Sequence, residues 1–431
     1  MRSAEDMSSG AEPLTDARLT GLAVLGGAPA FDRPRHVGRP NLGDRDRLLA
    51  RIDGMLDRLW FTNGGPLVQE FEEAVASIAG VRHCVATCNG TLALEILIRA
   101  VGLTDEVITT PFTFVATPHS LRWQGITPVF ADIDPRTHNI DPAQVERLIT
   151  PRTTGILGVH VWGRPCAVDD LQAIADRHGL PLLFDASHGL GCSSGGRMIG
   201  SFGAAETFSF HATKFVNAFE GGAIVTDDDD LAERARLIRN FGFADYDQVR
   251  SLGTNGKMSE VAAAMGLTSL EARDRFIAVN HQNYDAYRRG LDGVPGVELI
   301  FYDDEEATTR QYIVVEVDES AGLSRDDLCQ VLWAENVLAR RYFYPGCHRA
   351  EPYVSEQGPD QLRMPMTDRL AAQVLTLPTG TGVSTADIEV ITGLVRRAVS
   401  AGPALAAALP RRPGTPPAAV PVPPDEQPDG G

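Results

Sequence analysis

The chain has 431 residues, and its hydrophobic fraction of 43% and charged fraction of 22% are those of an ordinary globular protein. A net charge of −18, from 39 Lys and Arg against 57 Asp and Glu, argues against non-specific binding to nucleic acid, which needs a basic surface. Because 431 residues exceed the size at which a single hydrophobic core stops growing, we expect two domains.

The N-terminus has no basic segment followed by an apolar one, so no signal peptide is expected there. No apolar run approaches the ~18 residues of a membrane span, and we expect no membrane partner. Cys84 and Cys88 form a C-x3-C pair without a second pair, which disfavours a zinc site, so no metal is expected. Six cysteines in a chain of this length favour reduced thiols and a cytoplasmic protein.

Helix-like and strand-like segments alternate between about residues 68 and 240. The expected helices span 71–79, 91–102, 117–125, 141–149 and 167–179, and the expected strands span 83–87, 106–110, 127–133, 154–163 and 180–185. Apolar strands that alternate with helices predict an α/β domain in which helices cover both faces of a mostly parallel sheet. Ligands of such folds bind at the carboxyl ends of the strands, so the functional residues are expected there.

A long helix-like stretch over 258–291 could join the two domains, and the segments after it predict a smaller α+β domain. Beyond Pro410 the chain is rich in proline and has few large apolar residues, a composition typical of disorder. The expected organisation is a flexible N-terminal segment (1–20), a large ligand-binding domain (21–275), a small C-terminal domain (276–402) and a disordered tail (403–431).

Lys214 is the only fully charged side chain between Glu206 and Glu220, and four phenylalanines lie near it in the sequence. It could be a lysine that extends its amine into water at the end of a strand. Alternatively, it is a desolvated lysine whose lowered pKa makes the amine reactive, and the surrounding phenylalanines would lower that pKa. Its position alone favours the first interpretation, so other residues have to decide.

Asp185 ends the apolar run 180–185, which places its carboxylate at the ligand-binding edge of the sheet, and His188 follows three residues later. Residues 89–91 (Asn-Gly-Thr) begin a helix, where free N–H groups and the helix dipole favour an anion such as phosphate. Alone, the aspartate or Thr91 could simply cap a helix. Together with Lys214 they match what pyridoxal 5′-phosphate (PLP) requires: an amine for its aldehyde, a carboxylate for its pyridine nitrogen and a helix start for its phosphate.

Several motifs occur in an order that matches a known protein family. They include NGGPLVQEFE, CNGTLAL, PFTFVAT, PVFADIDPRTHNID, FDASHGLG, FSFHATKFVNAFEGGAIVT and GTNGKMSEVAAAMGL. From about residue 25 to 380 the chain resembles the DegT/StrS-type PLP-dependent nucleotide-sugar aminotransferases. The resemblance implies the aspartate-aminotransferase-like fold (PLP fold type I), with the large domain binding PLP.

The resemblance also implies roles for individual residues. Lys214 would bind the cofactor's aldehyde and later carry protons, Asp185 would face the pyridine nitrogen, and His188 would lie near the phenolic oxygen. The other implied cofactor contacts are Gly90, Thr91 and Ser209 to the phosphate, Phe114 to the face of the ring, and Asn255 to the phosphate in the neighbouring subunit. The last contact would make the protein a homodimer with shared active sites.

The small domain offers candidates for substrate binding. Arg340 and Arg341 could contact the substrate's diphosphate, because guanidinium groups pair well with phosphate oxygens, or they could be a solvated charge pair. Tyr342, Tyr344 and His348 could line the sugar pocket. Lys257, in the GTNGKMSE motif, could help to neutralise the diphosphate.

Some relatives of this kind carry histidine in place of the lysine and catalyse dehydration, so Lys214 favours transamination. The resemblance implies transfer of an amino group from L-glutamate to C4 of dTDP-4-keto-6-deoxy-D-glucose, giving dTDP-4-amino-4,6-dideoxy-D-glucose for antibiotic deoxyaminosugars. One alternative is a 3-ketosugar or cyclitol-ketone aminotransferase of the same family. A second, from another class, is a non-catalytic regulatory or scaffold protein on the PLP fold.

Overall fold

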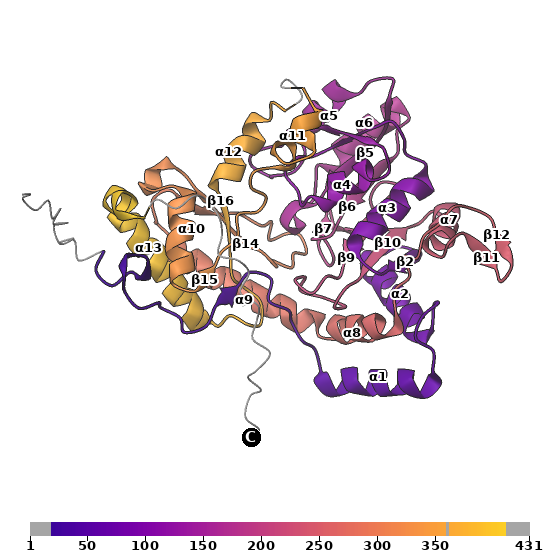
Figure 1. Cartoon of the computed structure of the whole chain (residues 1–431), viewed down its shortest axis with the longest axis horizontal. Helices are drawn as coiled ribbons and strands as arrows, with labels where there is room; N and C mark the ends of the chain where they lie inside the picture. Colours follow the sequence, from indigo (N-terminus) through magenta and orange to yellow (C-terminus); the bar gives the residue numbers. More distant parts are fainter. Residues whose placement is uncertain (1–18, 359–361, 411–431) are drawn as a thin grey trace, which may run out of the picture.

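The computed structural model describes residues 19–358 and 362–410 (Figure 1). Residues 1–18 of the expected N-terminal segment, and the part of the expected tail beyond residue 410, lie outside the described residues. Within the two described ranges, no helix combines the length and the apolar character needed to cross a membrane.

A seven-stranded sheet forms the centre of the large domain, in the order β2-β10-β9-β6-β5-β3-β4. Its strands are β2 (His83–Thr87), β3 (Glu106–Thr109), β4 (Thr127–Phe130), β5 (Thr153–Val159), β6 (Leu182–Asp185), β9 (Ala205–Ser209) and β10 (Gly222–Thr226). Neighbouring strands are parallel except at β10, which is antiparallel to both β2 and β9. The predicted mostly parallel sheet is confirmed.

Helices cover both faces of this sheet, as its apolar strands require. One face packs against α2 (Pro66–Ala79), α5 (Pro142–Leu148), α6 (Val168–His178) and α8 (Glu260–Glu271). The other face packs against α3 (Gly90–Val101), α4 (Ala116–Arg122) and α7 (Asp229–Arg239). Gly102 and Gly179 end α3 and α6 in the left-handed conformation, with φ of 86° and 63°, which is where glycine is favoured.

Three shorter features complete this part of the chain. The first helix, α1 (Arg45–Arg58), packs against α8. The strand pairs β7 (Ser193–Ser194) with β8 (Arg197–Met198) and β11 (Phe243–Asp245) with β12 (Gln248–Val249) form small hairpins, and the second projects from the molecule (Figure 1). β5 is shorter than the expected strand 154–163, because Trp162 adopts a left-handed conformation with φ of 65° and turns the chain.

The expected helical stretch over 258–291 is two helices, since α8 ends at Glu271 and α9 begins at Arg273. α9 leads into a second hydrophobic core around a three-stranded sheet, and we propose that the two domains meet along α8 and α9. The elements here are α9 (Arg273–Leu291), β13 (Val297–Leu299), β14 (Ile313–Val317), α10 (Arg325–Ala334), β15 (Val337–Leu338), α11 (Tyr353–Glu356), α12 (Pro365–Gln373), β16 (Val374–Leu377) and α13 (Thr385–Ala408).

The N-terminal segment packs with this second core. Leu19, Leu22 and Phe31 are buried in it, and β1 (Arg35–His36) pairs in parallel with β15. This differs from the expected assignment of residues 21–36 to the large domain, because a pairing more than 300 residues apart has no local sequence pattern. At the other end, α13 continues past a bend at Gly402 to Ala408, beyond the expected start of the tail at 403.

Candidate active site

Two predicted site residues lie at the carboxyl ends of neighbouring strands. Asp185 is the last residue of β6 and Ser209 the last of β9, and Asp185 pairs with Thr207 in the parallel ladder. Because side chains alternate along a strand, Asp185 and Ser209 share a face with Leu183 and Ala205, which belong to the core beneath α3. The sheet therefore brings both residues to one edge on the α3 side.

The carboxylate of Asp185 is buried and has no ion-pair partner in the described part of the chain. The side chain is 4% exposed; its Oδ2 accepts a hydrogen bond of 2.7 Å from Thr117 Oγ1, and its Oδ1 accepts one of 3.0 Å from the Ser187 N–H. A buried charge is unfavourable unless an opposite charge lies near it. This site suits a cationic ligand group, such as a protonated pyridine nitrogen.

The start of α3 lies directly beside Ser209. A Cβ atom placed on Gly90 would be 3.0 Å from the Cβ of Ser209, so glycine allows the close approach. Asn89, not Thr91, caps the helix, because its side chain accepts the Leu92 N–H at 2.8 Å. The N–H groups of Gly90 and Thr91 consequently have no acceptor among the described residues, and with the helix dipole they fit a phosphate group.

Lys214 lies in the loop between β9 and β10, and its Nζ is 3.5 Å from the hydroxyl of Tyr312. Burial lowers the pKa of its amine to about 8, against the opposing effects of the negative charge of Asp185 and of Tyr342. The direction of this shift agrees with the predicted reactive lysine. At pH 7 about a tenth of such an amine is unprotonated, far more than for a lysine with the ordinary pKa of 10.5.

The expected cause of the shift was wrong in one respect. Phe208, Phe210 and Phe215 belong to the core on the opposite face of the sheet, and Phe219 is 48% exposed. The groups that interact with the amine of Lys214 are Asp185, His188, Tyr312 and Tyr342.

His188 is buried, and its Nδ1 accepts the backbone N–H of Trp162 at 3.2 Å. A neutral imidazole that accepts at Nδ1 carries its proton on Nε2, which makes Nε2 a donor. Burial and the nearby charge of Lys214 hold the pKa of His188 well below its usual value, so the ring is neutral. The ring of Tyr312 packs against it at 4.6 Å between centroids, which links His188 to Lys214.

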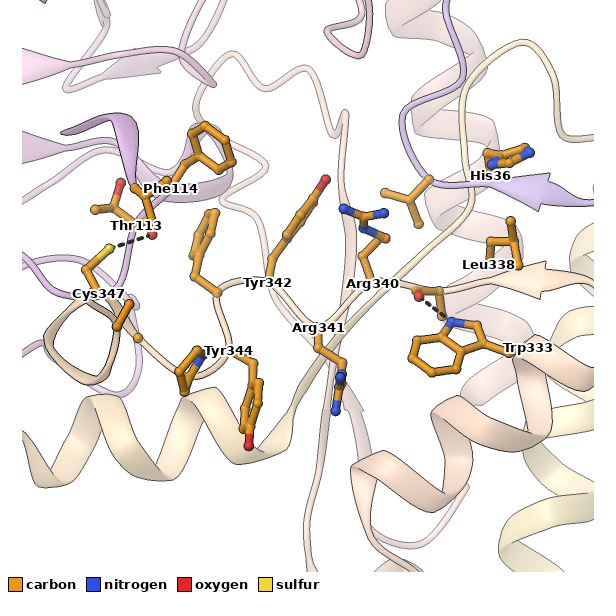
Figure 2. A pocket seen from close by; sticks show the side chains of 17 residues that line it. His36, Thr113, Phe114, Trp333, Leu338, Arg340, Arg341, Tyr342, Tyr344 and Cys347 are labelled. Atoms are coloured by element: carbon orange, nitrogen blue, oxygen red, sulfur yellow. Dashed lines mark hydrogen bonds between the residues drawn. The ribbon is translucent and has the colours of Figure 1, made fainter. Parts of the chain in front are cut away.

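A pocket of about 540 Å³ lies between Phe114 and the segment that follows β15. Lys214, Asp185 and His188 do not line it, but Phe343, which does, stacks on His188 at 6.4 Å between ring centroids. Phe114 lines the pocket and is 59% exposed, so its ring is accessible to a ligand bound there. Figure 2 shows that Arg340 and Tyr342 point to the same side of this segment as Phe114, whereas Arg341 and Tyr344 point to the other. Tyr342 is the member of this group that interacts electrostatically with Lys214.

Arg341 is committed to other protein groups. It forms an ion pair of 3.0 Å with Asp326 and lies 4.9 Å above the ring of Tyr344 and 5.6 Å from that of Trp333. Arg341 and Tyr344 also line the pocket, but they point to the side opposite Arg340 and Tyr342 (Figure 2). Their expected contacts with the substrate stay predictions.

His348 does not line this pocket. It is fully buried, and its Nε2 lies 2.9 Å from a carboxylate oxygen of Asp368, which also binds Arg349 at 2.6 Å. Burial lowers the pKa of His348, and Asp368 opposes that shift. The expected contact of His348 with a sugar is replaced by this internal pair.

The chain is similar to known aminotransferases in sequence and in structure. The sequence model of the DegT/DnrJ/EryC1/StrS aminotransferase family matches residues 44–396. The chain belongs to this family. The dTDP-4-amino-4,6-dideoxy-D-glucose transaminase of Shigella dysenteriae is 36% identical over 367 residues, covering 85% of this chain and 99% of that protein. A putative L-glutamine:3-amino-2,3-dideoxy-scyllo-inosose aminotransferase of Streptomyces kanamyceticus is 35% identical, covering 81% of this chain and 90% of that protein.

A solved structure of DesI, determined in the presence of its TDP-sugar product, has a TM-score of 0.87 and 55% sequence identity. The match covers 90% of this chain and 99% of that chain. The protein is an aminotransferase with the expected aspartate-aminotransferase-like fold, and enzymes of this family and fold use PLP. The interpretation as a non-catalytic scaffold is not supported.

In this aminotransferase, the motif around Asn255 lies near the start of α3 but forms its own contacts. Asn255 is exposed and its backbone pairs with Asn240. The backbone of Lys257 pairs with Thr87, three residues before Gly90, while its Nζ donates to Asn240 Oδ1 at 3.0 Å. A contact of Asn255 with a neighbouring subunit stays a prediction.

Sequence reasoning missed two residues of the aminotransferase site. Thr117 supports Asp185 from α4, and Tyr312 meets Lys214 from the residue before β14. Both are ordinary core-type positions in the sequence. Only the packing of distant segments shows their role.

Proposed function

We propose that this aminotransferase moves an amino group from L-glutamate to C4 of dTDP-4-keto-6-deoxy-D-glucose, forming dTDP-4-amino-4,6-dideoxy-D-glucose. The observation that carries the reaction class is the convergence of Lys214, Asp185 and the start of α3 at one edge of the sheet. The names of the Shigella relative and of the DesI structure support the sugar.

The residues at this edge fit PLP. Asp185 would hold the pyridine nitrogen protonated, the N–H groups of Gly90 and Thr91 with the hydroxyl of Ser209 would bind the phosphate, and Phe114 would cover the ring. The Nε2–H of His188 would donate toward the phenolic oxygen. When bound, PLP supplies an electron-withdrawing ring that makes the C–H bond beside the transferred nitrogen acidic.

Lys214 holds and moves the proton. Its amine has a pKa of about 8, so it can take a proton from one carbon and return it to another near neutral pH. The hydroxyl of Tyr312 accepts a hydrogen bond from the Nζ at 3.5 Å and orients the amine. A buried amine with this pKa, near Asp185 and Tyr312, can act as both general acid and general base near neutral pH.

On the substrate side, Tyr342 lines the pocket and interacts electrostatically with Lys214, so it suits the sugar. Arg340, which lines the same pocket, and Lys257, near the start of α3, suit the diphosphate. The protein would act as a homodimer in which the exposed Asn255 reaches a partner's phosphate site. The six free cysteines are compatible with a cytoplasmic enzyme. The Streptomyces relative supports a second candidate, a cyclitol-ketone aminotransferase.

The product distinguishes these candidates. The protein is incubated with PLP, L-glutamate and dTDP-4-keto-6-deoxy-D-glucose, and NMR identifies the carbon that carries the new amine. Amination at C4 is expected, and it should vanish in Lys214→Met. Amination only of a 3-ketosugar or a cyclitol ketone would reject the C4 assignment. Borohydride reduction of the PLP-loaded protein should place the label on Lys214; no label there would reject the reaction class.

A further inference from the structure

Residues 35–41, which we call the N-terminal strap, run from the second core to the loop that carries Lys214. The strap begins with β1, where His36 pairs with Leu338. A Cβ atom on Gly38 would lie 2.9 Å from the Cβ of Thr213, and Asn41 Nδ2 donates to the carbonyl oxygen of Phe215 at 3.0 Å. The strap is thus fixed to the residues directly before and after Lys214.

Two basic side chains of the strap gather near Arg340. His36 and Arg340 both line the 540 Å³ pocket; Figure 2 shows Arg340 next to Tyr342, and His36 at the end away from Phe114. The stem of Arg39 lies against Gly382, where an added Cβ atom would meet its Cδ at 2.6 Å. His36 pairs with Leu338, two residues before Arg340, and lies three residues before Arg39. Burial and the charges of Arg39 and Arg340 lower the pKa of His36.

These cations lack the counter-charges that neighbouring arginines have. Arg35 pairs with Asp387 at 3.0 Å and Arg341 with Asp326 at 3.0 Å. Neither Arg39 nor Arg340 has an ion-pair partner among the described residues, although acidic residues outnumber basic ones by 57 to 39 in the sequence. A group of like charges without a counter-ion is unfavourable, and a bound anion would relieve the repulsion.

We propose that His36, Arg39 and Arg340 form the binding site for the phosphate groups of the nucleotide carrier. The inference rests on the proposed function and deepens it, since the sequence assigned this role to Arg340 and Arg341. Guanidinium groups bind phosphate oxygens in pairs of parallel hydrogen bonds, which two arginines from different segments supply here. The strap precedes residues 44–396, so the family match does not include His36 or Arg39.

The arrangement also joins phosphate binding to the reacting amine. The guanidinium of Arg340 lies 5.5 Å from the ring centre of Tyr342, and Tyr342 interacts electrostatically with Lys214. A sugar beside Tyr342 would therefore have its phosphates toward Arg340 and the strap. Because the strap is bonded to the loop of Lys214, binding there would also hold the amine in place.

Binding of dTDP to the PLP-loaded protein, measured by calorimetry without an amino donor, tests the proposal. We expect Arg39→Gln and Arg340→Gln each to weaken dTDP binding by about tenfold, since a hydrogen-bonded charge is lost in each. Binding of thymidine, which has no phosphate, should change little. His36→Asn should weaken dTDP binding less, because the lowered pKa leaves its ring uncharged at neutral pH.

Two matched controls test the geometry. Arg341→Gln removes the adjacent arginine that pairs with Asp326, and Arg289→Gln removes an exposed arginine of α9; both should bind dTDP like the parent protein. Far-UV circular dichroism and the absorption of bound PLP establish that each variant is folded. Unchanged dTDP binding in Arg39→Gln, or an equal loss in Arg341→Gln, would overturn the inference.

The outcomes separate this inference from the proposed function. If the parent protein binds dTDP and the strap variants bind it equally well, only the phosphate site is wrong. If the parent protein binds no dTDP yet aminates another ketone, both the phosphate site and the dTDP-sugar assignment fail, while the transaminase activity stands.

Discussion

The amine of Lys214 lies 3.5 Å from the phenol oxygen of Tyr312, which stands 98 positions later in the chain and belongs to the other hydrophobic core. The reactivity of the lysine therefore depends on how the two cores pack together. A change in the second core should be measurable as a change in the chemistry of an amine in the first.

Replacing Tyr312 tests this dependence. Tyr312→Phe keeps the ring but removes an acceptor that favours the protonated amine, so the pKa of Lys214 should fall below about 8. The pKa of Lys214 is measured from the pH dependence of the rate at which its amine is acylated in the cofactor-free protein. Transamination should fall by about fivefold through the lost hydrogen bond. An unaltered pKa would show that the 3.5 Å contact has no electrostatic role.

The pH dependence of the reaction follows from the same amine. The step in which Lys214 accepts a proton needs the neutral form, so its rate should rise with pH and level off above about 8. Single-turnover kinetics with a deuterated amino donor would isolate this step. A rate that continued to rise toward the usual lysine pKa of 10.5 would mean that burial does not shift the group.

The stability of the folded protein should also depend on pH through Lys214. The folded pKa of Lys214 is about 8 and its unfolded value is 10.5, so between these values the unfolded chain binds more protons and stability rises with pH. Lys214→Met removes this dependence. Without cofactor, the variant should be more stable than the parent protein, and the difference should be largest below pH 8. Urea unfolding at pH values on both sides of that window measures the difference; an equal gain throughout would contradict the shift.

Asp185 should be required for its charge more than for its shape. Asp185→Asn keeps the size of the side chain but cannot stabilise a cation, and we expect transamination to fall by about 10- to 100-fold. Thr117→Val is the matched control, since it keeps the carboxylate and removes only its 2.7 Å hydrogen bond. Measured kcat values that fell further for Thr117→Val than for Asp185→Asn would argue against the assigned role.

Gly90 should be required for its small size. Gly90→Ala adds a Cβ atom 3.0 Å from Ser209 Cβ, in the space assigned to the phosphate, and should weaken PLP binding by about tenfold or more. Fluorescence titration of the cofactor-free protein with PLP measures the change. Ser209→Ala, which removes a hydroxyl without adding atoms, should have a smaller effect. Equal affinities for the parent and Gly90→Ala would place the phosphate elsewhere.

Local patterns explain what the sequence predicted well. The strand that ends in Asp185 and the helix that begins at Gly90 follow from short apolar runs and a helix-start pattern, which depend on neighbouring residues. The alternation of side chains in TFSF could also have placed Phe208 on the face away from Ser209, so the error about the phenylalanines was avoidable.

Contacts between distant segments explain what the sequence could not predict. Tyr312 meets Lys214, and the strap meets Thr213, only after two domains have packed together. Arg341 and His348 have the residue types of a substrate site, yet Arg341 forms an ion pair with Asp326 and His348 a hydrogen bond with Asp368. Residue type and spacing do not show which arginine already has a partner.

The position of Leu19, Leu22 and Phe31 in the second core has a consequence for synthesis on the ribosome. These side chains emerge first, but their partners in α13 are translated almost last. For most of translation they have no native surface to cover, and the large domain can fold without them. Nascent chains stalled before residue 385 should therefore expose this segment to proteases, whereas the released protein should protect it.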